Sequence, residues 1–488
     1  MIRLKNIFVS SALAVSAFAF SQGTFTTSTY PQSYDNQSSS SPKDFSSTTT
    51  EKLMTAKELV DININSMMSD PVLRNASWGF VIYDPKTKKV VSSYNENTPL
   101  VPASTTKLLT TETAISLLGE KFRWITQLEY SGTVNLDGTL QGNLYVVGSG
   151  DPSLGTNKAG AASYKDIVSD FVLAMAEKGI KKVSGDIIIQ SGVFKVNKSQ
   201  TLPENIVWLE NGNYYLPVGS TLQISPSNEK LIAKQSNPFA ESKNFYYISP
   251  YIKQMVYADK FEGMGLTTKV PDAPAYLANV LRATLIKSGI PVVGKVVPKL
   301  TDLNPEKREL ITSYQSPSLT DILIYTNQHS DNGLAEAFLR TVGFQKNGDQ
   351  TLESGRAAVI SHLNSIGFDT SGLNYMDGSG LSRSNLVTPI AQVKFLTGLM
   401  NEKFYKSYFD SLPIGGQTGT LKKMFNGEGY GQIFAKTGTL NKVKTLAGYM
   451  KTNSGKTLVF SLLINNYAGS VDQVKNKMEQ LLQPALSL

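Results

Sequence analysis

Three short groups of residues in this chain of 488 could together cleave an acyl bond. The first is Ser104-Thr105-Thr106-Lys107, at the expected start of a helix. Residues three apart share a helix face, so the lysine amine can lie beside the serine hydroxyl. A serine needs a neighbouring base to attack a carbonyl, and a desolvated lysine can serve as that base. One such motif is a weak signal, because Ser40–Lys43 and Ser227–Lys230 repeat the spacing in predicted loops.

The second group is Ser330-Asp331-Asn332, in the break between two predicted helices. Its hydroxyl could pass a proton to a leaving amine, and its amide could hold the amide of a substrate. The alternative is an ordinary polar turn between helices, because Ser-x-Asn also occurs at Ser93 and Ser242.

The third group is Lys436-Thr437-Gly438, followed by Thr439, at the end of a predicted strand. A lysine and hydroxyls in this place can bind a terminal carboxylate. The glycine lets a substrate backbone approach and pair along the strand edge. The tripeptide occurs once, whereas Gln417–Thr420 imitates it without the charge and is predicted to be a loop.

The composition excludes several other chemistries. The chain has no cysteine and two histidines, His329 and His362, so a zinc site is hard to build. A Gly-rich phosphate loop is also absent from the sequence, and we expect neither a metal nor a cofactor. The base should therefore be a residue other than histidine, and we interpret His329, beside Ser330, as a structural residue at a helix end.

A net charge of +8 fits anionic wall polymers, membrane surfaces or simple solubility. Without a Lys/Arg block, nucleic acid is not an expected partner.

The N-terminal 52 residues are predicted to lie outside the folded domains. Residues 1–21 have a short basic start, an apolar stretch and small residues at its end, which is typical of a secretory signal peptide. The apolar stretch is too short to span a bilayer, and no transmembrane segment is expected in the mature chain. Residues 22–52 are rich in Ser and Thr and poor in aliphatic residues, which favours a disordered leader. Export without disulfides predicts a bacterial envelope protein in the periplasm.

Hydrophobic periodicity divides the rest of the chain into two kinds of region. A hairpin at 78–94 and a helix after Pro102 come first, and three strands and a helix come last. Short strands and turns dominate between 126 and 270. We predict an α+β fold, in which a discontinuous catalytic domain of residues 53–125 and 271–488 has an antiparallel sheet flanked by helices, and residues 126–270 form a large, mostly β insert of one or two subdomains. Other expected helices are 164–178, 273–288, 319–328 and 333–342, and the last strands are 432–436, 445–451 and 457–464.

The order of the three groups, on a helix start, an interhelical turn and a strand, is the motif set of serine penicillin-recognising enzymes. The chain resembles the D-alanyl-D-alanine carboxypeptidase/endopeptidases of the penicillin-binding protein 4 type, which are low-molecular-mass class C penicillin-binding proteins with a β-lactamase/transpeptidase-like domain. The long interval between Ser104 and Ser330 agrees with this type, which carries inserted domains. The resemblance rests on Pro102–Lys107, Gly148–Pro152, Asp377–Arg383, Gly419–Leu421 and Ala435–Leu440.

The resemblance implies a serine D,D-peptidase that acts on the peptide stems of peptidoglycan and is acylated by β-lactams. Ser104, deprotonated by Lys107, would attack the carbonyl of the penultimate D-alanine. Ser330 would relay the proton to the leaving group and Asn332 would orient the peptide. The backbone N–H groups of Ser104 and Thr439 would form the oxyanion hole. The terminal carboxylate would be bound by Lys436, Thr437 and Thr439, beside Gly438.

Two further positions are implied as substrate contacts. Arg383 would touch the substrate, or alternatively form a loop-stabilising ion pair with Asp377. Phe194 resembles an insert position that approaches the substrate side chain in some members. Those members carry an acidic residue where this chain has Gln190.

Other functions remain open at this point. A β-lactamase would need a dedicated activator of the deacylating water and would not need the insert. A non-catalytic wall-binding scaffold is disfavoured because all three motifs are intact. The residues do not separate carboxypeptidase from endopeptidase activity, since both use the same serine.

Overall fold

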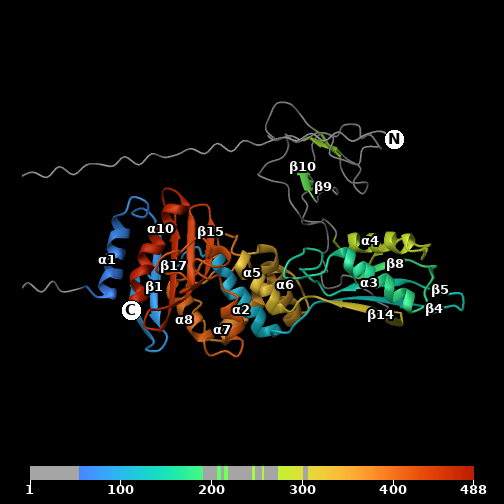
Figure 1. Ribbon diagram of the computed structural model, residues 1–488, viewed down its shortest axis with the longest axis horizontal. Helices are drawn as coiled ribbons and strands as arrows, with labels where there is room; N and C mark the ends of the chain where they lie inside the picture. The colour runs from blue at the N-terminus through green and yellow to red at the C-terminus, as the bar shows by residue number, and fades with distance from the viewer. Residues whose placement is uncertain are drawn as a thin grey trace, which may run out of the picture. The chain divides into compact units, whose positions relative to one another are not determined.

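The computed structural model describes residues 54–190, 273–299 and 306–488, together with the backbone of four short strands between them (Figure 1). The described residues do not include the predicted signal peptide and leader. They also do not include Phe194 or the two other segments with Ser-x-x-Lys spacing, Ser40–Lys43 and Ser227–Lys230. The four strands pair as two antiparallel hairpins, β9 (Ile206–Leu209) with β10 (Tyr214–Pro217) and β11 (Phe245–Tyr247) with β12 (Met255–Tyr257).

The first sheet is assembled from the two ends of the described chain. Its five strands lie in the order β15-β16-β17-β1-β2, and every neighbouring pair is antiparallel. Register pairs Val81 with Ser461, so the N-terminal hairpin and the C-terminal strands form one surface, as predicted. The strands are β1 (Ser77–Asp84), β2 (Lys89–Tyr94), β15 (Ile433–Leu440), β16 (Val443–Lys451) and β17 (Thr457–Asn465).

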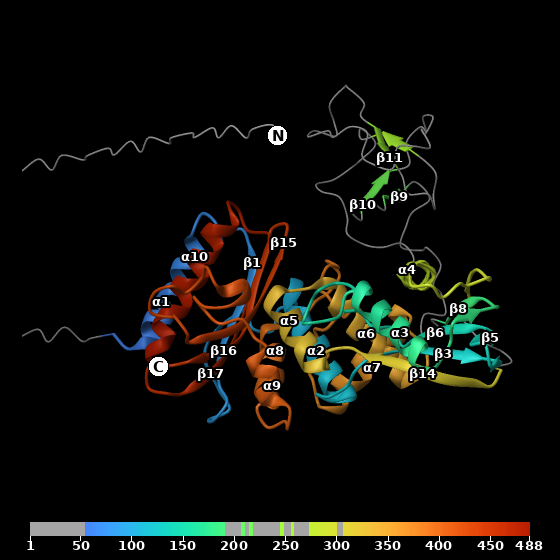
Figure 2. The same ribbon diagram turned by 45° about the vertical axis from the view of Figure 1, so that its right-hand side comes forward.

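Both faces of this sheet are covered, which explains why β16 and β17 are almost entirely buried and mostly apolar. On one face, Phe80 and Leu462 pack with Met478 of the C-terminal helix. On the other face, Val81 and Leu463 join the core of a helical layer. Figures 1 and 2 show α1 and α10 on one side of the sheet and α2, α5 and α8 on the other. The helices are α1 (Ala56–Ser69), α2 (Lys107–Leu118), α5 (Leu319–His329), α6 (Asn332–Asn347), α7 (Leu352–Ser365), α8 (Pro389–Leu399), α9 (Tyr405–Asp410) and α10 (Val471–Leu482).

A second five-stranded sheet lies in the inserted region, with the order β13-β8-β6-β3-β14. The pairs β13-β8 and β8-β6 are parallel, whereas β6-β3 and β3-β14 are antiparallel. Helices α3 (Tyr164–Glu177) and α4 (Ala273–Lys287) bury Phe171 and Leu281 with Leu128 of the sheet. The strands are β3 (Ile125–Ser131), β6 (Leu144–Gly148), β8 (Ile187–Gln190), β13 (Val296–Pro298) and β14 (Arg308–Gln315), and a small sheet adds β4 (Thr133–Val134), β5 (Thr139–Gln141) and β7 (Lys182–Val183).

The packing bears on the predicted boundary of the insert at residue 270. Helix α4, which the sequence groups with the catalytic domain, buries Leu277 and Leu285 in the core of the second sheet, and β13 and β14 belong to that sheet. An amphipathic pattern indicates that a helix buries one face but not which sheet receives it. We therefore propose that the insert extends to about residue 315 and includes α4, a helix that the sequence predicts at 273–288 but that its position in the chain assigns to the catalytic domain.

Helix α2 is buried on all sides of its first nine residues although several of them are polar. The hydroxyls of Thr111 and Thr113 donate to the carbonyls of Lys107 and Leu109 one turn back, so they need no water. Glu112 accepts hydrogen bonds from His362 of α7, at 3.0 Å from each carboxylate oxygen. Burial raises the pKa of Glu112, and the bond from His362 opposes that rise.

The two histidines provide a matched test of this buried pair. His362→Ala should lower the free energy of unfolding by roughly 1–3 kcal/mol, because it leaves a buried carboxyl without its partner. His329 is exposed and stacks on Tyr325, so His329→Ala should change stability by less than about 0.5 kcal/mol. Urea denaturation followed by circular dichroism measures both, and equal midpoints for the two variants would contradict the assignment.

Candidate active site

Ser104 lies in a tight turn that leads into α2. The turn is the short 3-10 helix η1 (Ala103–Thr106), and α2 continues from Lys107. The hydroxyls of Thr105 and Thr106 donate to the carbonyls of Pro102 and Ala103, each at 2.8 Å, which fixes the turn. Ala103 has a positive φ of 46°, a conformation that a non-glycine residue adopts only where its surroundings hold it. The serine is therefore placed by a rigid element, as its motif predicts, but on a 3-10 turn.

Lys107 is fully buried and its ammonium contacts three oxygens. Its Nζ lies 3.1 Å from Ser104 Oγ, 2.7 Å from Asn332 Oδ1 and 2.6 Å from the carbonyl of Ser379. Burial lowers the pKa of Lys107 to about 8, while the carboxylates of Glu336, Asp377 and Asp331 act to raise it. An amine with such a pKa is partly unprotonated near neutral pH and can accept the proton of Ser104.

The Ser-Asp-Asn group occupies the break between α5 and α6. Ser330 ends α5 in a left-handed conformation, with φ 56° and ψ 40°, and Asp331 caps α6 through the N–H of Leu334. Ser330 Oγ accepts a hydrogen bond of 2.8 Å from Lys436 Nζ. The second motif thus contacts both of the others: Asn332 contacts Lys107 of the first motif, and Ser330 contacts Lys436 of the third.

Strand β15 carries the third group past the serine. Lys436 is fully buried, and burial, together with the nearby cations Lys107 and Lys444, lowers its pKa. A side chain at Gly438 would place its Cβ 2.8 Å from the backbone nitrogen of Ser104, so only glycine lets the strand approach the turn. The sequence predicts that this glycine leaves room for the backbone of a substrate. The structure shows that it also leaves room for the protein's own turn at Ser104.

The segment Asp377–Arg383 closes the site beside Lys107. The carboxylate of Asp377 accepts hydrogen bonds from the N–H groups of Gly380 and Ser382, which holds the loop in place. Gly380 has a φ of +80°, and its Cβ would come within 1.9 Å of the carbonyl of Ala103. The loop therefore packs tightly on η1 and presents the Ser379 carbonyl to Lys107.

Arg383 is exposed, and its guanidinium donates to the carbonyl of Asn441, at the end of β15. The alternative partner, Asp377, is engaged by backbone amides and by Asn385 instead. Arg383 therefore lies beside the end of β15, the strand that carries Thr439.

Three residues that the motifs do not single out also belong to this arrangement. Glu336, one helical turn after Asn332 on α6, accepts a 2.8 Å hydrogen bond from the N–H of Ser379. Thr420, in the predicted loop that also contributes to the family resemblance, accepts from the hydroxyl of Thr437 at 2.8 Å. Lys444 donates to Thr439 Oγ1 at 2.8 Å, and burial lowers its pKa to about 8. The i,i+4 spacing of Asn332 and Glu336 is the one signal that could have revealed such a residue from the sequence.

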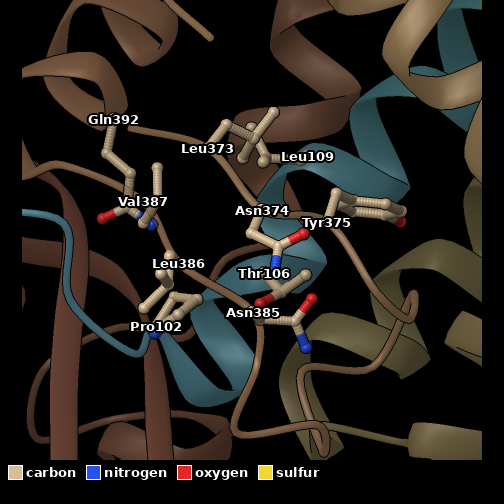
Figure 3. A pocket seen from close by; sticks show the side chains of 10 residues that line it. All are labelled: Pro102, Thr106, Leu109, Leu373, Asn374, Tyr375, Asn385, Leu386, Val387 and Gln392. Carbon is tan, nitrogen blue, oxygen red and sulfur yellow. The ribbon is translucent and has the colours of Figure 1, made fainter. Parts of the chain in front are cut away.

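A narrow recess lies next to η1, between the start of α2 and the segment 373–387 (Figure 3). Its lining includes Pro102, Thr106 and Tyr375, and the Tyr375 hydroxyl lies 2.6 Å from Thr110 Oγ1. None of the motif amines or serine hydroxyls lines the recess, so we assign it no part in the chemistry.

Within the described part of the chain, no group of three or more His, Asp or Glu side chains is placed to hold a metal ion. No helix among the same residues is both long and apolar enough to cross a membrane.

Comparisons with known proteins place this arrangement in a family. Residues 60–242 and 254–485 match the D-Ala-D-Ala carboxypeptidase 3 (S13) family. A D-alanyl-D-alanine carboxypeptidase of Haemophilus influenzae is 26% identical over 464 residues, which cover 86% of this chain and 92% of the relative. One from Actinomadura sp. is 26% identical over 447 residues, which cover 83% of this chain and 81% of the relative.

Solved structures show the same fold. The crystal structure of penicillin binding protein 4 from Haemophilus influenzae matches with a TM-score of 0.66 at 24% identity, over 87% of this chain and 98% of that chain. Its complex with a β-lactam matches with a TM-score of 0.65 at 23% identity over the same shares. These likenesses confirm the predicted fold class.

The pKa of Lys107 predicts a pH dependence. If the free amine is the base, the acylation rate of Ser104 should rise with pH through the pKa of Lys107, about 8. Glu336→Gln keeps an oxygen for the Ser379 N–H but removes a negative charge that stabilises the ammonium. The pKa of Lys107 should fall, so the rising limb of the profile should move to lower pH.

The acylation rate against pH, measured with a chromogenic acyl donor, tests this shift. Glu353→Gln, which removes an exposed carboxylate from α7, should leave the limb in place. A limb that does not move in Glu336→Gln would rule out the electrostatic coupling of Glu336 to Lys107.

Proposed function

Because the chain belongs to the D-Ala-D-Ala carboxypeptidase 3 (S13) family, we propose that Ser104 is the nucleophile of an exported serine D,D-peptidase. The observation that carries the proposal is the buried contact of Lys107 Nζ with both Ser104 Oγ and Asn332 Oδ1. It gives the serine a base that is within reach and partly unprotonated, and it joins two of the three motifs.

Acylation would begin with proton transfer from Ser104 Oγ to the free amine of Lys107. The oxygen attacks the carbonyl carbon of the penultimate D-alanine, and the negative charge that develops is stabilised by the backbone N–H groups of Ser104 and Thr439. The proton then passes through the Ser330 hydroxyl to the leaving amine as the peptide bond breaks. Lys436 Nζ donates a hydrogen bond to Ser330 Oγ. The hydroxyl hydrogen of Ser330 therefore has to point away from Lys436, which leaves it available for the relay.

Substrate binding would involve β15, which is an edge strand of the first sheet. The terminal carboxylate of the peptide would be held by Lys436, Thr437 and Thr439, with Asn332 oriented to the peptide amide. Thr420 accepts from Thr437, and Lys444 donates to Thr439, so each threonine hydroxyl has a fixed neighbour. Arg383 stands beside the end of the strand and would touch the substrate from there.

Release of the acyl group would follow by attack of water on the ester carbon, and one proton of that water would pass to Ser104 Oγ as its bond to the acyl carbon breaks. A β-lactam offers the same carbonyl but keeps its leaving amine tethered, so its acyl-enzyme should persist. The structure of the Haemophilus influenzae protein with a β-lactam supports this choice of inhibitor. The predicted signal peptide and the peptide stems of peptidoglycan as substrate support a location in the periplasm.

Labelled penicillin tests the nucleophile directly. Wild-type protein should become labelled, and Ser104→Ala should lose both the label and the release of D-alanine from a pentapeptide, because no other nucleophile replaces it. Ser384→Ala, which removes an exposed serine after the Asp377–Arg383 loop, should retain both. Denaturing gels and a D-alanine assay provide the measurements, and a label that persists in Ser104→Ala would refute the proposal.

Purified cross-linked muropeptides extend the test to the preferred substrate. Cleavage of dimers that also depends on Ser104 would add endopeptidase activity to the carboxypeptidase activity. Rapid turnover of nitrocefin by the wild type would instead indicate a β-lactamase.

A further inference from the structure

A loop of the insert reaches the break between α5 and α6. It lies between β6 and α3, and it places Lys158 Nζ 2.5 Å from Asp331 Oδ2. The side chains are 34% and 14% exposed, so the pair is partly shielded from water. Because the two residues are 173 positions apart, the contact joins separate parts of the fold.

Both carboxylate oxygens of Asp331 are in use. Oδ1 accepts from the N–H of Leu334 at 2.9 Å and caps α6, while Oδ2 accepts from Lys158. Burial alone would raise the pKa of Asp331, but the hydrogen bonds from Lys158 and from the Leu334 amide bring it below its usual value. The residue is therefore a carboxylate at neutral pH, which an ammonium can hold.

Asp331 lies between Ser330 and Asn332, the two residues whose side chains have to stay aligned with Lys436 and Lys107. Ser330 has a left-handed backbone, with φ 56°, which costs free energy and persists only where the surroundings hold it. Asn332 is the first residue of α6, and its side chain receives the hydrogen bond from Lys107. A shift of Asp331 would displace the acceptors of both Lys436 and Lys107.

The loop is built to present Lys158. The residues on either side of it, Asn157 and Ala159, have positive φ angles of 57° and 52°. Ala159 packs against the helical core next to the first sheet. Earlier in the loop, Ser153 is tied to the carboxylate of Asp151 through its N–H and its hydroxyl, at 2.8 and 2.6 Å. Two non-glycine residues in a strained conformation around one lysine indicate that the position of its ammonium matters.

We propose that Lys158 is a positioning residue, which acts through Asp331 to keep Ser330 and Asn332 aligned with Lys436 and Lys107. The inference rests on the proposed function, because the alignment matters only if Ser330 relays a proton and Asn332 orients the peptide. It gives the insert a part in the chemistry besides any contact with the substrate.

Replacement of the lysine tests the inference. Lys158→Met should lower kcat for D-alanine release by roughly ten- to a hundredfold, the loss expected when reacting groups are displaced by about 1 Å. KM and the melting temperature should change little, because the substitution alters neither the side chains proposed to bind the terminal carboxylate nor the hydrophobic cores of the two sheets. Lys158→Arg, which keeps the charge, should recover most of kcat. Lys165→Met, at an exposed lysine of α3 in the same insert, is the matched control and should behave as wild type.

A double-mutant cycle separates this role from general destabilisation. Asp331→Asn keeps an oxygen for the Leu334 N–H but loses the charge that binds Lys158. If Lys158 acts through Asp331, adding Lys158→Met to Asp331→Asn should cause no further loss of kcat. Wild-type kcat in Lys158→Met, or losses that multiply in the double variant, would overturn the inference. Failure of the wild type itself to take up labelled penicillin would overturn the proposed function instead.

Discussion

The burial of one lysine amine organises this molecule. Lys107 is withdrawn from water, and an ammonium in that position is tolerated only if its hydrogens meet acceptors. The three oxygens that meet it come from Ser104, Asn332 and Ser379, which belong to a turn, a helix start and a loop. Each has to be held within hydrogen-bonding distance, so the requirement passes to the elements behind them. The same burial lowers the pKa of the amine to about 8, as the base that we propose would require.

The first sheet and its glycines meet that requirement. The sheet is assembled from strands of both ends of the described chain, and its edge strand β15 passes directly beside the turn that carries Ser104. The approach leaves no room for a Cβ at Gly438, and the loop on the other side leaves none at Gly380. These glycines are thus required by contacts within the protein. Because neither glycine has a side chain, the backbones of β15 and of the Asp377–Arg383 loop can both pack directly on the turn that carries Ser104.

The insert extends the same logic. Its sheet has a core of its own with α3 and α4, yet one loop returns Lys158 to the break between α5 and α6. A large insertion in a fold of this kind could serve substrate binding alone. The ion pair with Asp331 suggests that it also supports the alignment of Ser330 and Asn332.

The sequence alone determined which residues we propose for the chemistry: a serine with a lysine one turn away, a second serine with an amide, and a lysine and threonine on a strand. It also determined the antiparallel sheet and the helix after Pro102, because these follow from residue types and periodicities that act over a few positions. Only the tertiary structure decided which sheet receives α4, that Thr420 meets Thr437, that Glu336 holds the Ser379 amide, and that Lys158 reaches Asp331. Those contacts join residues far apart in the chain, and a local pattern states that a side chain is buried or polar without stating its partner. The fold chooses the partner, because the free energy of each contact is realised only when distant segments pack together.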